Sequence, residues 1–437
     1  MSRWLSTDLY ELHMAAGYLE RGMTQDATFS LFVRELPSTR AFAVAVGLED
    51  CLEALEHFGL DESDLLYLRD PLGFSDAQCK ALGQLHFSGQ VRAVPEGRIV
   101  LAGEPLLEVT APLPEAQVIE SLLLNQITYQ SAIASKAARC RLAAAGRIEL
   151  VEFGLRRSHG LEAAMAAARA SVICGFSGTS NVAAARRFEL DAVGTMAHSF
   201  VEAFRDEQTA FAAYARGAHA HPTFLVDTYD TLAGVEVAAK VIADHDLAEC
   251  AAVRLDSGDL IDLSRRARQL LDAAGLAKVR ILVSGDLDEN RLEECVRNQA
   301  PIDAAGIGTR LDVAADAPYL GTVYKLVEYA GRPVAKRSVG KQTLPGAKQV
   351  FRAARLSDTL SLRSEPVPAG AEPLLDVVME RGKRTSFALD APSCVRAARR
   401  RFERDLGELP DELRSLDVGP ASPRLSTELL KLDEAFT

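Results

Sequence analysis

The chain has no long hydrophobic run. No stretch of about 18 apolar residues occurs without a charge, so no membrane-spanning helix and no membrane partner are expected. The segment from Met1 to Asp8 also lacks the apolar core of a secretory signal. These absences predict a cytoplasmic protein. Its 437 residues, 48% of them hydrophobic, are enough for two or three domains with a large core.

Cysteine is scarce, and basic residues are outnumbered by acidic ones, 49 to 61. The seven cysteines are scattered, with no C-x-x-C pair and no histidine cluster at zinc spacing, so buried free thiols are expected and no metal-ligating residues are predicted. The net charge is −12 and no basic tail offsets it, which argues against a nucleic-acid partner. Any phosphate-bearing ligand must therefore be held by a local site.

Two common catalytic motifs are missing as well. There is no G-x-S-x-G elbow, which argues against a serine hydrolase of the α/β type. There is also no P-loop. Other phosphate-binding chemistry has to come from a different arrangement of loops.

What the chain does contain is a repeated strand ending. From Ile148 onwards, short apolar runs stop at small and polar residues, with alanine- or leucine-rich helical stretches between most of them. Seven such endings are visible: Glu152-Phe153-Gly154, Gly175 to Ser180, Val193-Gly194-Thr195, Val226-Asp227-Thr228, Leu255 to Gly258, Val283 to Asp286 and Ile307-Gly308-Thr309. This βα repeat predicts an irregular TIM-like α/β barrel, with an open doubly wound sheet as the second choice.

The pattern also divides the chain. Residues 1–125 are expected to form a smaller α+β domain, residues 126–320 the catalytic barrel, and residues 321–437 a C-terminal segment that packs on the N-terminal domain. In either α/β fold the ligand binds at the carboxyl ends of the strands. The recurring Gly, Ser, Thr and Asp at those ends describe a phosphosugar pocket, because backbone N–H groups and hydroxyls donate to phosphate oxygens.

The stretch Val253 to Leu260 organises this repeat. Asp256-Ser257-Gly258-Asp259 forms a strand-to-helix turn with two carboxylates and one hydroxyl. Asp256 and Asp259 suit sugar hydroxyls or a hydrated Mg²⁺, and Ser257 suits a substrate oxygen. Asp259 also has a purely structural interpretation as a helix cap.

Basic residues and one histidine occupy other strand endings. Arg156 follows the first strand, and the guanidinium fork suits a carboxylate or phosphate. Arg254 precedes the carboxylates, where it neutralises them or binds a substrate anion. His198 lies one turn beyond Gly194-Thr195 and is a candidate nucleophile or general base. Near the start, Thr7-Asp8 can cap a helix in which Tyr10 falls off the apolar face.

These blocks occur in one order that resembles nicotinate phosphoribosyltransferase. They are Thr7-Asp8-Leu9-Tyr10, FGLRRSHG from Phe153, GFSGTSN from Gly175, GTMAHS from Gly194, VRLDSGDL from Val253, SGDLDE from Ser284, GIGT from Gly306, YKL from Tyr324 and KQTLPGAKQVFR from Lys341. The resemblance runs from residue 7 to about residue 352. Residues beyond that point match no pattern of the family.

The resemblance implies a ligase-type enzyme of NAD salvage that joins nicotinate to 5-phosphoribosyl 1-diphosphate, with ATP as co-substrate and Mg²⁺. It implies a phosphohistidine at His198, nicotinate contacts at Tyr10, Thr195 and Arg254, and a phosphoribosyl contact at Thr309. It further implies the fold of a type II phosphoribosyltransferase and a homodimer with shared sites. Within such a pocket, Arg156 and Arg254 suit the anions, and Gly285 with Gly308 and Thr309 suits the 5-phosphate.

Two other functions fit the same residues. One is a phosphoribosyltransferase for another pyridine such as nicotinamide, which would need no anion partner for its neutral amide. The other is a non-catalytic sensor of NAD precursors that kept the pocket. The presence of His198, Asp256 and Asp259 favours the enzyme.

Overall fold

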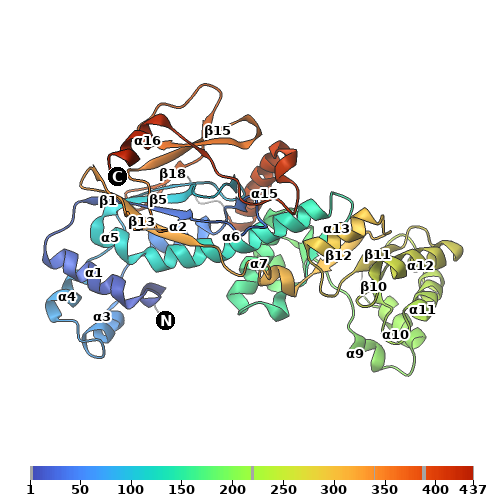
Figure 1. The fold of residues 1–437 in the computed structure, drawn as a ribbon. Coiled ribbons are helices and arrows are strands. Elements are labelled where there is room, and N and C mark those ends of the chain that lie inside the picture. The colour runs from blue at the N-terminus through green and yellow to red at the C-terminus, as the bar shows by residue number, and fades with distance from the viewer. Residues whose placement is uncertain (1–2, 218–220, 339, 386–389, 437) are drawn as a thin grey trace. The chain divides into compact units, whose positions relative to one another are not determined.

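The structure is a computed structural model that describes residues 3–217, 221–338, 340–385 and 390–436 (Figure 1). The chain forms two compact units. Unit 1 contains residues 1–135 and 319–437, and unit 2 contains residues 136–318. The first boundary falls inside the long helix α6 (Glu120–Ala143). Within the described residues, no helix combines the length and the apolar character that crossing a membrane requires.

Unit 2 is built on one parallel sheet of seven strands. Its strands are β6 (Glu149–Glu152), β7 (Gly178–Thr179), β8 (Asp191–Ala192), β9 (Thr223–Leu225), β10 (Ala252–Leu255), β11 (Arg280–Val283) and β12 (Ala304–Ile307). Their order in the sheet is β8-β7-β6-β12-β11-β10-β9. Six of the seven expected strand endings include or directly follow the last residue of a strand. The second differs, because β7 lies inside it and the apolar run before it forms helix α7 (Leu161–Ile173).

That order identifies the fold. The first strand of the unit, β6, pairs with the last, β12, and the other strands follow in chain order on both sides. A doubly wound sheet does not join its first strand to its last, whereas a barrel does. The edges of the sheet are β8 and β9, so the barrel is open between them. The prediction of an irregular α/β barrel is confirmed.

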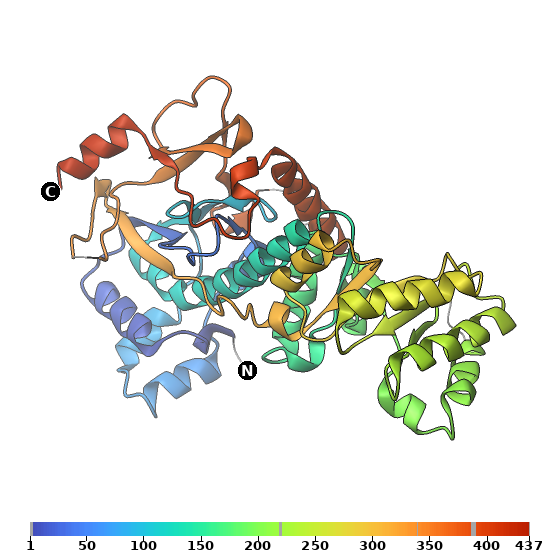
Figure 2. The ribbon, with the colours of Figure 1, turned by 45° about the vertical axis from the view of Figure 1, so that its right-hand side comes forward.

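Helices follow most of the strands. They are η2 (Leu155–Arg157), α7 (Leu161–Ile173), α8 (Val182–Phe188), α9 (His198–Glu202), α10 (Glu207–Ala215), α11 (Thr231–Asp244), α12 (Leu260–Ala273), α13 (Glu289–Arg297) and α14 (Thr309–Asp312). Asp230, Asp259 and Asp288 cap α11, α12 and α13 through bonds from backbone N–H groups. Helices α11 and α12 lie side by side in both views of the ribbon (Figure 2). Val253 of β10 and Ile281 of β11 are fully buried, whereas Ala192 of the edge strand β8 is exposed.

Unit 1 contains an antiparallel sheet of seven strands in the order β14-β13-β1-β5-β3-β18-β19. These are β1 (Asp26–Val33), β3 (Gln90–Ala93), β5 (Pro105–Pro112), β13 (Thr322–Tyr329), β14 (Arg332–Pro333), β18 (Asp376–Glu380) and β19 (Lys383–Arg384). A second sheet has the order β17-β15-β16-β20, and β2 (Ala43–Val44) pairs with β4 (Ile99–Val100). Segments from both ends of the chain thus share one sheet.

The remaining elements of unit 1 surround these sheets. The second sheet consists of β15 (Lys348–Ala353), β16 (Ser357–Leu362), β17 (Glu372–Pro373) and β20 (Arg424–Leu425). The helices are η1 (Arg3–Leu5), α1 (Leu9–Glu20), α2 (Leu48–Glu56), α3 (Glu62–Arg69), α4 (Asp76–Leu82), α5 (Leu113–Val118), η3 (Ala354–Leu356), α15 (Ala391–Glu408), η4 (Asp411–Leu413) and α16 (Thr427–Glu434). Phe29 of β1 stacks on Tyr324 of β13 at 4.7 Å between ring centroids, which places an aromatic pair in the core.

Candidate functional site

The guanidinium group of Arg254 lies at the centre of the polar residues at the strand ends. Its Nε donates to Ser284 Oγ at 2.7 Å, its Nη1 to Thr195 Oγ1 at 2.7 Å and its Nη2 to Asp256 Oδ1 at 2.6 Å. Its side chain is only 12% exposed. A guanidinium has five N–H donors, and three are used here, so two remain for a ligand. The expected link between Arg254 and the carboxylates is therefore present, and Thr195 joins it.

The register of strands β9, β10 and β11 places the residues around Arg254 at the same edge of the sheet. Arg254 pairs with Leu225 of β9 and with Leu282 of β11. Asp227, Asp256 and Ser284 each lie two positions after one of those three residues, so they emerge together at the carboxyl edge of the sheet. Asp227 and Ser284 were not predicted as site residues. Both lie in predicted strand endings. The register between the strands, which places them beside Asp256, is the signal that identifies them.

Asp227 holds the turn that follows β10. Its Oδ2 accepts a bond from the backbone N–H of Asp256 at 3.1 Å and from Ser257 Oγ at 2.6 Å. Its Oδ1 is buried and has no hydrogen-bond partner among the described residues. Ser284 Oγ donates in turn to Asp256 Oδ1. Asp227 and Asp256 thus place carboxylate oxygens at the carboxyl edge of the sheet, and the buried Oδ1 of Asp227 is available to a further partner.

His198 is the first residue of α9 and is half-buried. Its Nδ1 lies 3.2 Å from Thr228 Oγ1, in the turn that also contains Asp227. The segment from Gly194 to His198 follows the edge strand β8, next to the opening of the barrel. Because Thr195 binds Arg254, this segment connects the histidine to the Arg254 cluster.

Glycines allow two of the turns to approach their neighbours closely. A Cβ atom on Gly285 would lie 2.1 Å from the carbonyl oxygen of Asp256, and φ at this residue is +93°. A Cβ on Gly308 would lie 2.8 Å from the carbonyl oxygen of Phe153. Neither position accepts a larger residue without movement of the backbone. The backbone is therefore closely packed where the 5-phosphate is expected.

Phe153 is a further residue that the sequence did not single out. The Arg254 guanidinium lies 5.9 Å from the centre of its ring. A Cβ on Gly306 would lie 2.5 Å from a ring carbon, so the glycine makes room for the ring. The ring gives the cluster one flat apolar face, and the partial exposure of Phe153 leaves it accessible.

Two buried carboxyl groups support the turn that carries Arg156. Glu152 and Asp312 are both 0% exposed. Burial and the charge of Glu152 raise the pKa of Asp312 to about 8, and burial raises the pKa of Glu152 as well. Arg156 itself is exposed in η2. Neither acid was predicted as a functional residue, because in the sequence each is one carboxylate among many.

Three predicted residues have more limited local roles. Asp259 is exposed and caps α12, accepting bonds from Ile261 N at 3.1 Å and Asp262 N at 3.2 Å, as its structural interpretation expects. Thr309 is exposed at the first position of α14. Tyr10 belongs to unit 1, where it is 50% exposed on α1. Its pKa is raised to about 12 by partial burial and by the charges of Glu120 and Glu11.

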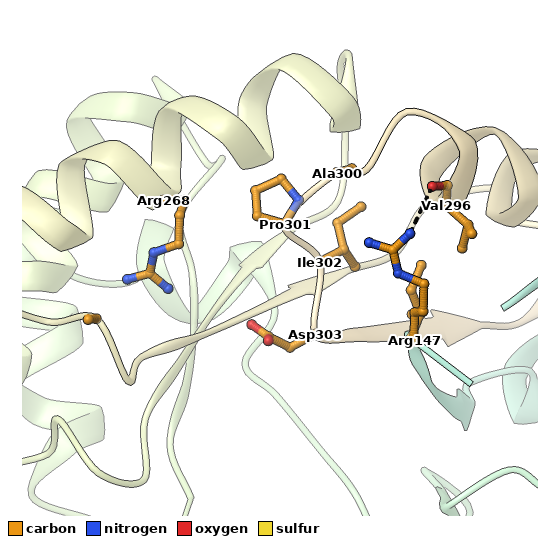
Figure 3. Close-up of a pocket in the computed structure, with 9 residues that line it drawn as sticks. Arg147, Arg268, Val296, Ala300, Pro301, Ile302 and Asp303 are labelled. Atoms are coloured by element: carbon orange, nitrogen blue, oxygen red, sulfur yellow. Dashed lines mark hydrogen bonds between the residues drawn. The ribbon is translucent and has the colours of Figure 1, made fainter. Parts of the chain in front are cut away.

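A cavity of about 320 Å³ lies at the opposite end of the strands (Figure 3). Arg147, Ala277 and Asp303, which contribute to its lining, precede β6, β11 and β12. Arg147 donates to the carbonyl oxygen of Val296 at 3.4 Å. Arg268 is engaged by Asp272 at 2.8 Å and by backbone carbonyls. This cavity is separate from the residues at the carboxyl ends of the strands.

The carboxylates at the strand ends suit a Mg²⁺ ion that is bound together with substrate, not a metal site made by the protein alone. Among the described residues, no group of three or more His, Cys, Asp or Glu could hold a metal ion. Mg²⁺ commonly binds through one or two carboxylates, completing its shell with water and substrate phosphate oxygens. Asp227 and Asp256 meet that smaller requirement.

Family models and similar proteins of known function match most of the length of the chain. The model of the nicotinate phosphoribosyltransferase N-terminal domain matches residues 5–128, and the model of the nicotinate phosphoribosyltransferase family matches residues 148–362. Nicotinate phosphoribosyltransferase pncB2 of Mycobacterium tuberculosis is 45% identical over 447 residues, covering 99% of this chain and 94% of the relative. The Bacillus subtilis enzyme is 45% identical over 357 residues, covering 80% of this chain and 72% of its own.

Two solved structures share the fold of this chain. The crystal structure of human nicotinic acid phosphoribosyltransferase superposes with a TM-score of 0.82 at 29% identity, covering 99% of this chain and 100% of that one. A nicotinate-nucleotide pyrophosphorylase structure from Pyrococcus furiosus gives a TM-score of 0.77 at 25% identity, covering 92% of this chain and 96% of that one.

Proposed function

The chain belongs to the nicotinate phosphoribosyltransferase family, and we propose that it couples the family's reaction to ATP hydrolysis through His198. In that reaction nicotinate and 5-phosphoribosyl 1-diphosphate give nicotinate mononucleotide and diphosphate, a step of NAD salvage. The observation that carries the assignment of the pocket is the Arg254 cluster at the carboxyl ends of the barrel strands.

The geometry suits displacement at the anomeric carbon. The pyridine nitrogen forms a bond to this carbon while the bond to the diphosphate oxygen breaks, and positive charge develops on the sugar ring. Carboxylates stabilise such charge when they are already in place. Asp227 and Asp256 lie together there, each fixed by hydrogen bonds. They would hold the ribose hydroxyls and Mg²⁺, and the charge of the bound cation would help to neutralise the leaving diphosphate.

Nicotinate has two features for the site to recognise, a flat ring and a carboxylate. The ring of Phe153 offers a face for the pyridine. Arg254 has two unused N–H donors for the carboxylate, which supports nicotinate over the neutral nicotinamide. Thr195 orients the guanidinium through a bond of 2.7 Å. Tyr10 would supply a second contact with nicotinate, from a partner subunit of a homodimer.

The phosphoribosyl group has separate contacts. Arg156 binds diphosphate oxygens, and Gly285, Gly308 and Thr309 receive the 5-phosphate through backbone N–H groups and a hydroxyl. Ser257 is exposed on the turn after β10, and its hydroxyl, which donates to Asp227 Oδ2, would accept a bond from a substrate hydroxyl. Asp259 acts through the helix that it caps, since both of its backbone contacts lie in α12.

In the proposed coupling to ATP, His198 forms a covalent bond to phosphorus. A histidine nitrogen takes the γ-phosphoryl group of ATP, releasing ADP, and water later breaks the phosphorus–nitrogen bond to release phosphate. The contact with Thr228 engages Nδ1, so Nε2 is left as the nucleophile. The negative charge of the phosphoryl group lies on the same segment as Thr195, which binds Arg254, and so affects the Arg254 cluster.

A cytoplasmic location remains a prediction from the sequence.

Diphosphate release tests the substrate assignment. The enzyme is given phosphoribosyl diphosphate with nicotinate or with nicotinamide, each with and without ATP. We expect a specificity constant at least about 100-fold higher for nicotinate, because one charged hydrogen-bonded pair contributes roughly 3 kcal/mol. Equal constants would favour the broader pyridine enzyme. No release with either pyridine, despite binding of both substrates, would favour the sensor.

A further inference from the structure

Glu152 and Asp312 form a buried acidic pair beneath two turns of the site. Glu152 ends β6, and Asp312 ends α14, the short helix that follows β12. Strands β6 and β12 are neighbours, and Glu152 pairs with Ile307 in the sheet. Both side chains are fully buried. A Cβ on Gly154 would lie 2.2 Å from the carboxyl carbon of Asp312, so this glycine is what admits the second acid beside the turn.

Each acid binds a different part of the turn after β6. Glu152 accepts bonds from the N–H groups of Gly154 and Leu155 and from the hydroxyl of Thr179. Asp312 accepts a bond from Ser158 Oγ. The turn also closes on itself, because Ser158 N donates to the carbonyl oxygen of Gly154 at 3.1 Å. Arg156 lies between the two anchored ends, and Thr309 begins the short helix that Asp312 ends.

We propose that Glu152 and Asp312 are a proton-sharing positioning pair, which fixes the turns of Arg156 and Thr309 for phosphoribosyl diphosphate. The substrate contacts of those two residues come from the proposed function. Two ionised carboxylates in one dry site repel each other, so the arrangement is stable with one negative charge. Glu152 keeps the charge because N–H and O–H donors face it, and Asp312 keeps the proton.

The elements that surround Glu152 and Asp312 also carry ionisable side chains. They are Arg156, Arg157, His159, Glu162, Arg169 and Arg310, from η2, the turn after it, α7 and α14. Arg310 is paired with Asp288 at 2.7 Å. The charge that raises the pKa of Asp312 is that of Glu152. Loss of the shared proton above pH 8 should therefore separate the acids and displace both turns.

The first test compares the wild type with Asp312→Asn over pH 6.5 to 9. Asparagine has nearly the same shape and mimics the protonated acid, but it cannot ionise. In the wild type, KM for phosphoribosyl diphosphate should rise about fivefold between pH 7 and 9, because Asp312 is mostly ionised about one unit above its pKa. In Asp312→Asn, KM should stay constant while kcat at saturation changes little in either protein. Glu152→Gln should raise KM at every pH, since it removes the negative charge that the N–H groups of Gly154 and Leu155 and the hydroxyl of Thr179 face.

The second test needs no activity and is thermal unfolding of both proteins between pH 4 and 9. The folded-state pKa of Asp312 is about 8, against 3.8 for an ordinary aspartate. The wild type thus loses stability as pH rises between those values, and Asp312→Asn lacks that loss. The Tm of the wild type should fall relative to that of the variant across this range. Parallel Tm and KM profiles for the two proteins would overturn the positioning pair. An enzyme inactive with all substrates would instead overturn the proposed function, and the unfolding comparison would still stand.

Discussion

At the scale of single residues, the site depends on groups that come from different strands. Arg254 binds side chains from three segments, Thr195, Asp256 and Ser284. The pairing of Arg254 with a carboxylate followed from the sequence, because the two stand two positions apart at one strand end. Ser284 and Asp227 did not, because their contribution depends on the register between strands. A single sequence carries no direct signal for that register.

Replacement of Arg254 tests its role as the anchor of the nicotinate carboxylate. Arg254→Ala should cost about 2 to 5 kcal/mol in nicotinate binding, since it removes one partner of a mostly buried charge pair. Arg254→Lys is the matched control, because it keeps the charge and loses the fork, and it should recover only part of the loss. Steady-state kinetics with nicotinate measure both. An unchanged KM for nicotinate in Arg254→Ala would contradict the assignment.

At the scale of elements, the strands of the barrel were the most predictable part. Five of them are short apolar runs followed by Gly, Ser, Thr or Asp, and the sheet buries those runs between helices. The two short strands β7 and β8 lack such a run, and both residues of β8 are exposed. Helix caps such as Asp259 were predictable for the same reason, because capping is local. The strand pairing of the C-terminal region was not predictable, although its packing on the N-terminal part was expected, since its strands pair with distant segments. Strands β18 and β19 extend a sheet that begins with β1.

Helix α15 gives this distant packing a chemical basis. Asp405 is 2% exposed, and its Oδ2 accepts bonds from Arg98 Nε at 2.8 Å, Arg352 Nη1 at 2.9 Å and Ile99 N at 3.0 Å. Asp358 also holds Arg352, at 2.6 Å. The network links α15 with β4 and β15. The C-terminal segment is therefore a structural part of unit 1.

Removal of Asp405 should destabilise unit 1. Asp405→Ala leaves buried cations and one backbone N–H with fewer partners, at a cost of about 3 to 5 kcal/mol. The control is Asp411→Ala, whose side chain is 98% exposed and whose change should stay within about 0.5 kcal/mol. Chemical denaturation measures both. Equal stability of the two variants would show that the network contributes nothing to folding.

At the scale of the whole molecule, the sequence predicted the family and the barrel but left the assembly as a proposal. Tyr10 is half-exposed on α1, in the unit that does not contain the barrel strands. Tyr10 is proposed to contact nicotinate but belongs to unit 1. This suits a dimer in which each active site uses residues of both subunits. The contact cannot be deduced from one chain, because a shared site depends on a second copy.

Mixed subunits test the shared site. Tyr10→Ala and His198→Ala proteins should each be inactive or nearly so, and dimers formed by mixing them should regain one working site. Tyr67→Ala is the control, because Tyr67 is also 50% exposed in unit 1 but belongs to α3, and it should keep full activity. Activity of the mixture is compared with that of each variant alone. No recovery after verified subunit exchange would mean that each site is complete within one subunit.

The most direct measurement of the ATP coupling is phosphoryl labelling of His198. Wild type and His198→Asn are incubated with γ-labelled ATP, and label that is acid-labile and base-stable is counted. Asparagine keeps a hydrogen-bonding group towards Thr228 but is no nucleophile. We predict label on the wild type and none on His198→Asn, which should retain slow ATP-independent transfer without ATP stimulation. Equal labelling of His198→Asn would contradict the account and make His159 the acceptor to test.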